Sequence, residues 1–130
     1  MLRLQLEINI WLPNGYTQTV AEHEEGHRQI SEYYYQTADK LAERIAASYV
    51  GKRVEVTGTD LDAESSKMLL QVATDITNEY AKEINANPTQ LLYDTITDHA
   101  RNGVVAKEAV DHALKNAAIE ATQPTANPGN

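Results

Sequence analysis

Residues 19–49 decide the fold and read TVAEHEEGHRQISEYYYQTADKLAERIAASY, with the pentapeptide HEEGH at positions 23–27. Apolar residues in the later part of this stretch recur at spacings of three and four, which is typical of the buried side of an amphipathic helix. The residues on that side are Ile30, Tyr34, Ala38, Leu41, Ile45 and Tyr49. The pattern predicts one long helix, and its apolar stripe, extended towards the N-terminus, passes through His27 and His23.

The ends and the interior of this predicted helix carry local signals. Thr19 suits the N-cap, because Glu22 three residues later completes a capping box. Gly51 suits the left-handed position that follows a helix C-terminus. Gly26 inside the helix costs about 1 kcal/mol relative to Ala. We therefore expect a close approach by another backbone at Gly26, such as a strand that crosses the helix.

The pentapeptide has the spacing of a zinc-binding helix. His23 and His27 lie four residues apart, so their imidazoles project from one side of the helix, one turn apart. Glu24 lies about 100° further round the helix, beside the metal, where it can take a proton from water. This is the H-E-x-x-H signature of zinc peptidases. Of the two other histidines, His112 is expected to be a packed or surface residue, which leaves His99 as a possible ligand.

An alternating pattern precedes the helix. Leucine or isoleucine occupies every even position from 2 to 12, and this period of two predicts a β-strand with one buried face. Residues 52–57 form the only other strand-like run, and a lone strand is unstable without a partner. We expect the sheet to be only partly contained in this chain, and the chain to be a trimmed piece or a mature fragment.

Further helices are expected downstream. The spacing predicts a second helix from residue 59 or 60 to about 84, packed antiparallel to the first, and residues 85–88 (NANP) end it. Residues 89–102 have helical character without a clean period, and a shorter third helix follows over about 104–118. The expected class is α+β and predominantly helical.

Length and composition limit the possible functions. We expect one domain over 1–120 and a disordered tail over 121–130, because the tail has nothing to bury. The chain has no cysteine, so a metal site must use histidine and carboxylate, which suits catalytic zinc. A net charge of −8 without a basic stripe argues against nucleic acid as a partner. No apolar run is long enough to span a bilayer, and nothing indicates the oligomeric state.

Zinc needs a third protein ligand, and the residues leave alternatives. His99 is favoured, because it lies in a dense polar cluster and would complete a three-histidine site with one position open to water. Glu79 on the second helix is the competitor, and Asp94 or Asp98 is a further alternative. As a non-ligand, Asp94 would orient a ligand imidazole. Tyr93 would donate a hydrogen bond to the oxyanion formed from the scissile carbonyl.

Two segments together resemble a known family. HEEGH at 23–27 followed by YDTITDH at 93–99 is similar to the predicted secreted zinc-dependent proteases, a bacterial family of domains of unknown function. That family pairs H-E-x-G-H with Y-D-x-x-T-x-H-G, and a strand precedes its helix. The resemblance covers about residues 6–103 and departs at Ala100, where the family pattern has glycine.

The resemblance implies a zincin-like fold, a secreted or periplasmic location, and peptidase activity. It also favours His99 over Glu79 as the third zinc ligand. The predicted function is hydrolysis of peptide bonds with Zn²⁺ as cofactor and Glu24 as general base, acting on a peptide or protein substrate. The alternatives are a metal-binding domain without activity and a helical protein-interaction domain in which the histidines are incidental.

Overall fold

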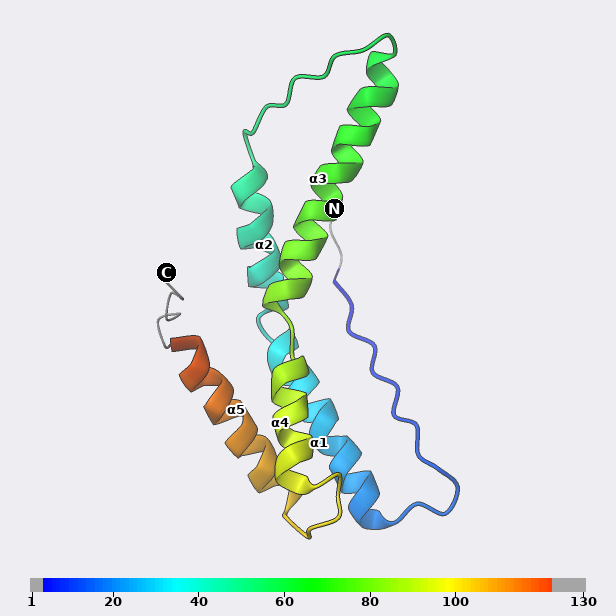
Figure 1. Cartoon of the computed structure of the whole chain (residues 1–130), viewed down its shortest axis with the longest axis vertical. Helices are drawn as coiled ribbons and strands as arrows, with labels where there is room; N and C mark the ends of the chain where they lie inside the picture. The colour runs from blue at the N-terminus through cyan, green and yellow to red at the C-terminus, as the bar shows by residue number, and fades with distance from the viewer. Residues whose placement is uncertain (1–3, 123–130) are drawn as a thin grey trace, which may run out of the picture. The chain divides into compact units, whose positions relative to one another are not determined.

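The computed structural model describes residues 4–122, and this part of the chain is helical without any strand. Five helices follow one another along the chain (Figure 1). They are α1 (Gln18–Tyr35), α2 (Ala38–Tyr49), α3 (Leu61–Glu83), α4 (Asn87–Thr97) and α5 (Ala106–Thr122). The predominantly helical class is therefore confirmed. No helix among the described residues is long and apolar enough to cross a membrane.

The described part of the chain forms two compact units, and the single domain over 1–120 stays a prediction. One unit contains Gln36–Asn85 together with Leu4, and therefore holds α2 and α3. The other contains Gln5–Tyr35 and residues 86–122, and therefore holds α1, α4 and α5. We call them the α2–α3 unit and the α1–α4–α5 unit.

The α1–α4–α5 unit has a small core at which all three helices meet. Its fully covered members are Ile30, Tyr93, Ala109, Val110 and Ala113. Small residues on α5 let this helix approach α1 and α4 closely, while the ring of Tyr93 fills the space between them. His112 on α5 is exposed, which agrees with its expected place as a packed or surface residue. This core is the platform on which the candidate site is built.

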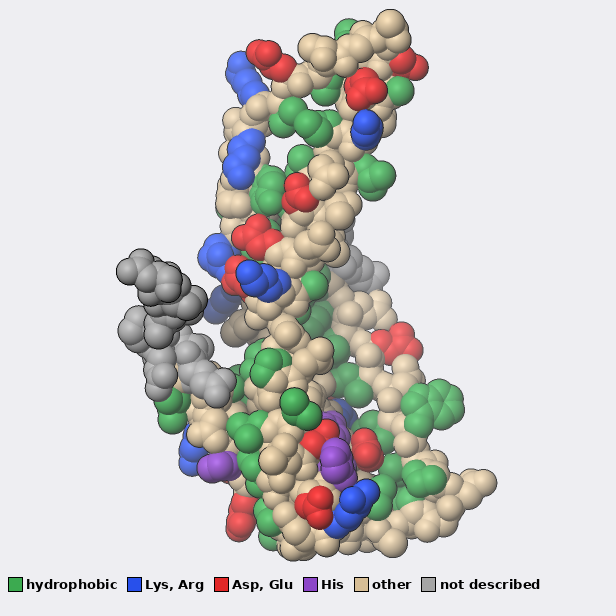
Figure 2. Space-filling model, viewed as in Figure 1, with side chains coloured by type: hydrophobic (Ala, Val, Ile, Leu, Met, Phe, Trp, Pro, Cys, Tyr) green, Lys and Arg blue, Asp and Glu red, His purple; other side chains and the backbone are tan. Residues whose placement is uncertain are grey.

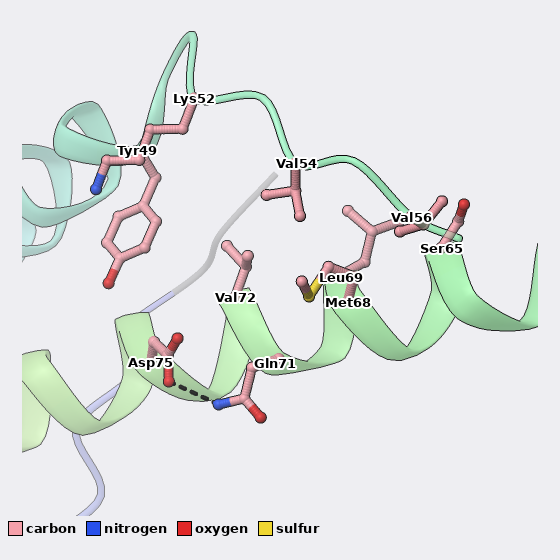
Figure 3. Close-up of a pocket in the computed structure, with 10 residues that line it drawn as sticks. All are labelled: Tyr49, Lys52, Val54, Val56, Ser65, Met68, Leu69, Gln71, Val72 and Asp75. Carbon is pink, nitrogen blue, oxygen red and sulfur yellow. Dashed lines mark hydrogen bonds between the residues drawn. The ribbon is translucent and has the colours of Figure 1, made fainter. Parts of the chain in front are cut away.

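The α2–α3 unit is a pair of helices that run side by side in opposite directions (Figure 1). On α2 the buried residues are Ala38, Ala42 and Ile45, whereas α3 buries none of its side chains. A groove of about 620 Å³ remains between α3 and the segment that follows α2. Val54 and Val56 line it from that segment, with Met68 and Val72 on α3 (Figure 3).

The predicted N-terminal strand is wrong for the described residues. Residues 4–13 are extended but pair with no other strand, and residues 52–57 are likewise unpaired. Because a strand needs a neighbour to satisfy its backbone groups, alternation without a partner does not make a sheet. Ile10 and Trp11 are accordingly exposed, by 41 % and 88 % of their surface.

The single long helix over 19–49 is also wrong, because it is interrupted after Tyr35. The break falls where three tyrosines are followed by Gln36 and Thr37, and tyrosine and threonine are weak helix formers. The N-cap is Thr17 and not Thr19, since the Thr17 hydroxyl accepts from the backbone N–H of Val20 at 3.4 Å. Apolar spacing alone does not reveal such a break.

The later boundaries agree better with the sequence. Asp60 caps α3 by accepting from the backbone N–H of Ala63 at 3.0 Å, and Gly51 has the expected positive φ, +80°. Pro88 lies in the first turn of α4, where its missing N–H costs nothing. Most of the predicted disordered tail, residues 123–130, lies outside the described residues, while 121 and 122 end α5.

Candidate metal centre

Two complementary helix faces form the site within the α1–α4–α5 unit. On α1, His23, Gly26 and His27 lie on the side that continues to buried Ile30. On α4, the facing residues follow the spacing i, i+3, i+4 and i+7, which keeps them on one side of a helix. They are Gln90, Tyr93, Asp94 and Thr97. Figure 2 shows histidine and acidic side chains next to one another over these helices.

Three potential ligand atoms converge between the two helices. Asp94 Oδ1 lies 3.0 Å from His27 Nε2 and 3.2 Å from His23 Nε2, and the two Nε2 atoms are 3.2 Å apart. A tetrahedral zinc ion with bonds of about 2.0–2.1 Å separates its ligand atoms by roughly 3.3 Å. The observed triangle is therefore close to the size that such an ion requires. His23, His27 and Asp94 are a group that could hold a metal ion.

The other nitrogen of each imidazole also has a partner on α4. His23 Nδ1 lies 3.2 Å from the hydroxyl of Thr97, and His27 Nδ1 lies 2.6 Å from Gln90 Oε1. Metal-binding histidines in proteins almost always have such a partner on the nitrogen that does not bind the metal. The two rings are thus held at both ends, and their Nε2 atoms point to one place.

The absence of a side chain at Gly26 leaves the space that the Tyr93 ring occupies. A Cβ atom on Gly26 would lie 2.2 Å from the Tyr93 hydroxyl oxygen and 2.5 Å from Cζ. The close approach expected at Gly26 therefore exists, but the neighbour is a tyrosine side chain and not a crossing strand. The Tyr93 ring stacks on that of His23 with centroids 5.0 Å apart, so glycine makes room for the ring that supports the first ligand.

The position of Tyr93 argues against its predicted role as oxyanion donor. Its side chain is 0 % exposed, and its hydroxyl donates to the backbone carbonyl of His23 at 3.0 Å. Burial, with the negative charges of Asp94 and Glu24, raises the pKa of Tyr93 to about 12. The hydrogen of this group is already used inside the protein, so Tyr93 supports His23 and is not free to donate to an oxyanion.

Burial also favours the ligand form of His23. The ring is buried, and this desolvation, followed by the nearby His27, lowers the pKa of His23, whereas Asp94 and Glu24 act in the opposite direction. A neutral imidazole has a free lone pair for a metal ion. Glu24 is half-buried on α1, close enough for its charge to act on His23 and Tyr93.

His99 lies at the edge of the site and not within the triangle. Its side chain is 61 % exposed, and its Nδ1 is 3.5 Å from the same Asp94 oxygen that faces the other two histidines. It belongs to a run of three left-handed residues after α4, with φ of 47° at Asp98, 52° at His99 and 68° at Ala100. Position 100, where the family pattern has glycine, is therefore one at which glycine is the unstrained residue.

The remaining ligand alternatives are placed elsewhere. Glu79 lies on α3 in the α2–α3 unit, beside Tyr49, where burial and the charges of Glu79 and Asp75 raise the pKa of Tyr49. Asp98 is exposed in the left-handed turn. Among the described residues, the group of potential ligand atoms contains neither of them. Asp94, predicted mainly as a residue that orients a ligand, lies in the position of a ligand itself.

Sequence reasoning assigned no role to Gln90 or Thr97, although both touch a ligand imidazole. The signal was present, because both lie on the same side of α4 as Tyr93 and Asp94. It was hidden because the inward side of α4 is largely polar, so an apolar period does not reveal it.

Comparison with protein-family models, curated proteins and solved structures finds no match to this chain.

Proposed function

We propose that the protein is a zinc-dependent metallopeptidase that hydrolyses peptide bonds at the centre formed by α1 and α4. The observation that carries the proposal is the triangle of His23 Nε2, His27 Nε2 and Asp94 Oδ1, with edges of 3.0–3.2 Å. Two imidazoles and a carboxylate are a donor set that suits catalytic zinc, which keeps one position for water or substrate.

The residues have distinct roles in this proposal. His23, His27 and Asp94 hold the ion, and Thr97 and Gln90 hold the two rings. A bound zinc ion would supply Lewis acidity, which would activate water and polarise the substrate carbonyl. Glu24 would accept a proton from the water that attacks the carbonyl carbon of the peptide, and would return this proton to the amine when the C–N bond breaks.

Two features support a peptidase over other zinc enzymes. Glu24 directly follows the first ligand on α1, which is the position of the general base in the H-E-x-x-H signature. The paired segments at 23–27 and 93–99, which resemble the secreted zinc-dependent proteases, lie against each other through His23, Tyr93 and Thr97. The zincin-like fold and the secreted or periplasmic location are proposed on that resemblance.

Replacement of the general base tests the proposal. Glu24→Gln is isosteric and removes the proton acceptor, so turnover of a peptide substrate should fall by at least about a hundredfold. Zinc content, measured by elemental analysis, should stay at the wild-type value. Glu22→Gln is the matched control on α1, since Glu22 is exposed and pairs only locally with Gln18. Full activity of Glu24→Gln would overturn the assignment.

A protein-interaction domain is the second candidate, and the groove of the α2–α3 unit favours it. Leu69 lines this groove and is 71 % exposed, and α3 buries no side chain of its own (Figure 3). An interaction domain with incidental histidines predicts no stoichiometric zinc and no effect of a chelator on the melting temperature. A zinc-containing protein without peptidase activity would favour the inactive metal-binding alternative.

A further inference from the structure

We infer that Gln90 is a positioning residue that sets the tautomer of His27, so that the Nε2 lone pair of this ring is directed at the metal position. Gln90 lies on the first turn of α4, outside both segments that resemble the protease family. The inference rests on the proposed metal centre, but it does not depend on peptidase activity.

The orientation of the Gln90 amide follows from its contacts. Its Nε2 donates to the backbone carbonyl of His27 at 3.1 Å and to the Ser31 hydroxyl at 3.0 Å, so both hydrogens are used. A flipped amide would place its oxygen against the His27 carbonyl, where two acceptors repel each other. Gln90 Oε1 must therefore face His27 Nδ1, from which it is 2.6 Å distant.

This orientation determines which nitrogen of His27 carries a hydrogen. An amide oxygen is only an acceptor, so a contact of 2.6 Å is favourable only if His27 Nδ1 donates. With its hydrogen on Nδ1, neutral His27 presents a free lone pair at Nε2, the atom that faces Asp94 and His23. Asp94 Oδ1, 3.0 Å from Nε2, is a competing acceptor for the same hydrogen, but the contact of Nδ1 with Gln90 is shorter, so Gln90 favours the tautomer that binds a metal before a metal arrives.

His23 has the same arrangement with a different partner, which makes an accidental contact at Gln90 a poor explanation. The Thr97 hydroxyl donates to the backbone carbonyl of Tyr93 at 2.9 Å, as is common for threonine within a helix. Its oxygen is then the acceptor for His23 Nδ1 at 3.2 Å. With a cation between the rings, both would give their Nδ1 hydrogens to α4 and direct Nε2 at the same position.

Gln90 acts on His27 in particular, because it contacts both the imidazole and the backbone carbonyl of this residue. Through Oε1 it accepts from the imidazole, and through Nε2 it donates to the backbone carbonyl of the same residue. A side chain that only filled space would fix the position of the ring without choosing its tautomer. Gln90 thus links the orientation of the His27 imidazole to the position of α4 along α1.

Nitrogen-15 NMR of the histidine side chains tests the inference directly. The chain has four histidines, so the spectrum is simple to assign. At about pH 8 ordinary imidazoles are neutral, and the wild-type protein should carry the His27 hydrogen on Nδ1, both with chelator and with added Zn²⁺. In Gln90→Leu the hydrogen should move to Nε2, where the Asp94 carboxylate accepts it.

Zinc affinity, measured by competition with a chromogenic chelator, is the second measurement. Gln90→Leu should bind Zn²⁺ about 10–100-fold more weakly than wild type, as is usual when the partner of a ligand histidine is removed. Gln90→Glu keeps an acceptor oxygen for Nδ1 and should retain the Nδ1 hydrogen, but its second oxygen faces the His27 carbonyl, so its affinity should fall less than that of Gln90→Leu without reaching the wild-type value. Gln29→Leu, at an exposed position on α1, is the matched control and should change neither.

The outcomes separate this inference from the proposed enzyme. A hydrogen on Nε2 of His27 in the zinc-free wild type, or wild-type affinity in folded Gln90→Leu, would overturn it. If Gln90→Leu does not fold, the inference is tested by the wild-type spectrum and by Gln90→Glu. A Gln90→Glu protein in which His27 lacks the Nδ1 hydrogen would also refute the inference. A protein that binds zinc with the expected tautomer but cleaves no peptide would refute only the peptidase.

Discussion

The two units of the chain use their interiors differently. In the α1–α4–α5 unit, buried polar groups lie beside the apolar core: His23, Thr89 and Thr97 are buried near Ile30 and Tyr93. No buried side-chain nitrogen or oxygen among the described residues lacks a hydrogen-bond partner. In the α2–α3 unit the buried side chains are aliphatic, and apolar surface stays open in the groove.

This difference shows which unit requires its side chains to be placed accurately. A polar interior must satisfy every donor and acceptor, since an unpaired buried group costs about 1–3 kcal/mol, and this requirement fixes the positions of its members. Apolar packing tolerates more variation in shape. The polar unit is therefore the one in which single substitutions should change function, and the predictions below sharpen that contrast.

The largest effect is expected from removal of a ligand in the polar unit. Asp94→Ala removes the oxygen that lies 3.0 and 3.2 Å from the two imidazole nitrogens, so zinc affinity should fall by more than about a hundredfold. Glu79→Ala, in the other unit, should leave zinc binding unchanged. His99→Ala should have a smaller effect than Asp94→Ala. If Glu79→Ala or His99→Ala lost zinc while Asp94→Ala kept its affinity, the residue replaced in that variant, and not Asp94, would be the third ligand.

Addition of zinc should stabilise one unit selectively. A ligand at a hundred times its dissociation constant stabilises the native state by about 2.7 kcal/mol. Thermal melts with and without chelator should show this gain, and amide hydrogen exchange should locate it in α1 and α4, with little change in α2 and α3. Equal protection in both units would contradict a centre confined to the α1–α4–α5 unit.

Gly26→Ala should disturb the same unit by steric overlap. The added methyl group would lie 2.2 Å from the Tyr93 hydroxyl, and overpacking costs about 1–3 kcal/mol. The better helix propensity of alanine offsets about 1 kcal/mol of this, so urea unfolding should show a net loss of up to about 2 kcal/mol. In a Tyr93→Leu background the same substitution should cost less, because the obstacle is gone, and additive losses would argue against direct overlap.

The smallest effect is a gain at the left-handed turn beside the site. Ala100 has φ of 68°, where an L-residue other than glycine is strained by about 1–2 kcal/mol. Ala100→Gly relieves this strain and loses part of the gain to unfolded-state entropy, so a net stabilisation of about 0.5–1 kcal/mol is expected from chemical denaturation. Ala81→Gly, within α3, should instead destabilise by about 1 kcal/mol. A loss of stability in both variants would mean that the turn is not strained.

How far the sequence predicted the site depends on the range of each interaction. His23 and His27 were recognisable as a pair, because four residues of helix place two side chains on one side whatever surrounds them. Asp94 was named only as a minor ligand alternative, since its distance to the histidines depends on how α4 packs against α1. Gln90 was missed, because its inward side chain is polar and the helix prediction relied on apolar spacing.

The prediction of the fold was limited in the same way, since it succeeded for local features and failed for contacts between distant segments. Asp60, Gly51 and Pro88 signal helix ends through local hydrogen bonding and backbone angles, and these positions agree with the structure. The alternation over residues 4–12 was as regular as that of a real strand, but pairing requires a second strand that the described chain does not provide.

By itself, the sequence determined the helical character, the end of α2, both ends of α3 and the paired histidines with Glu24 beside the first, because each depends on contacts within a few residues. Only the tertiary structure decided that the chain forms two units, that Asp94 completes the triangle, and that Gly26 is small to admit Tyr93. These features arise where residues more than sixty positions apart meet. The register of one helix against another is set by the packing of both faces together, and no single stretch of sequence contains it.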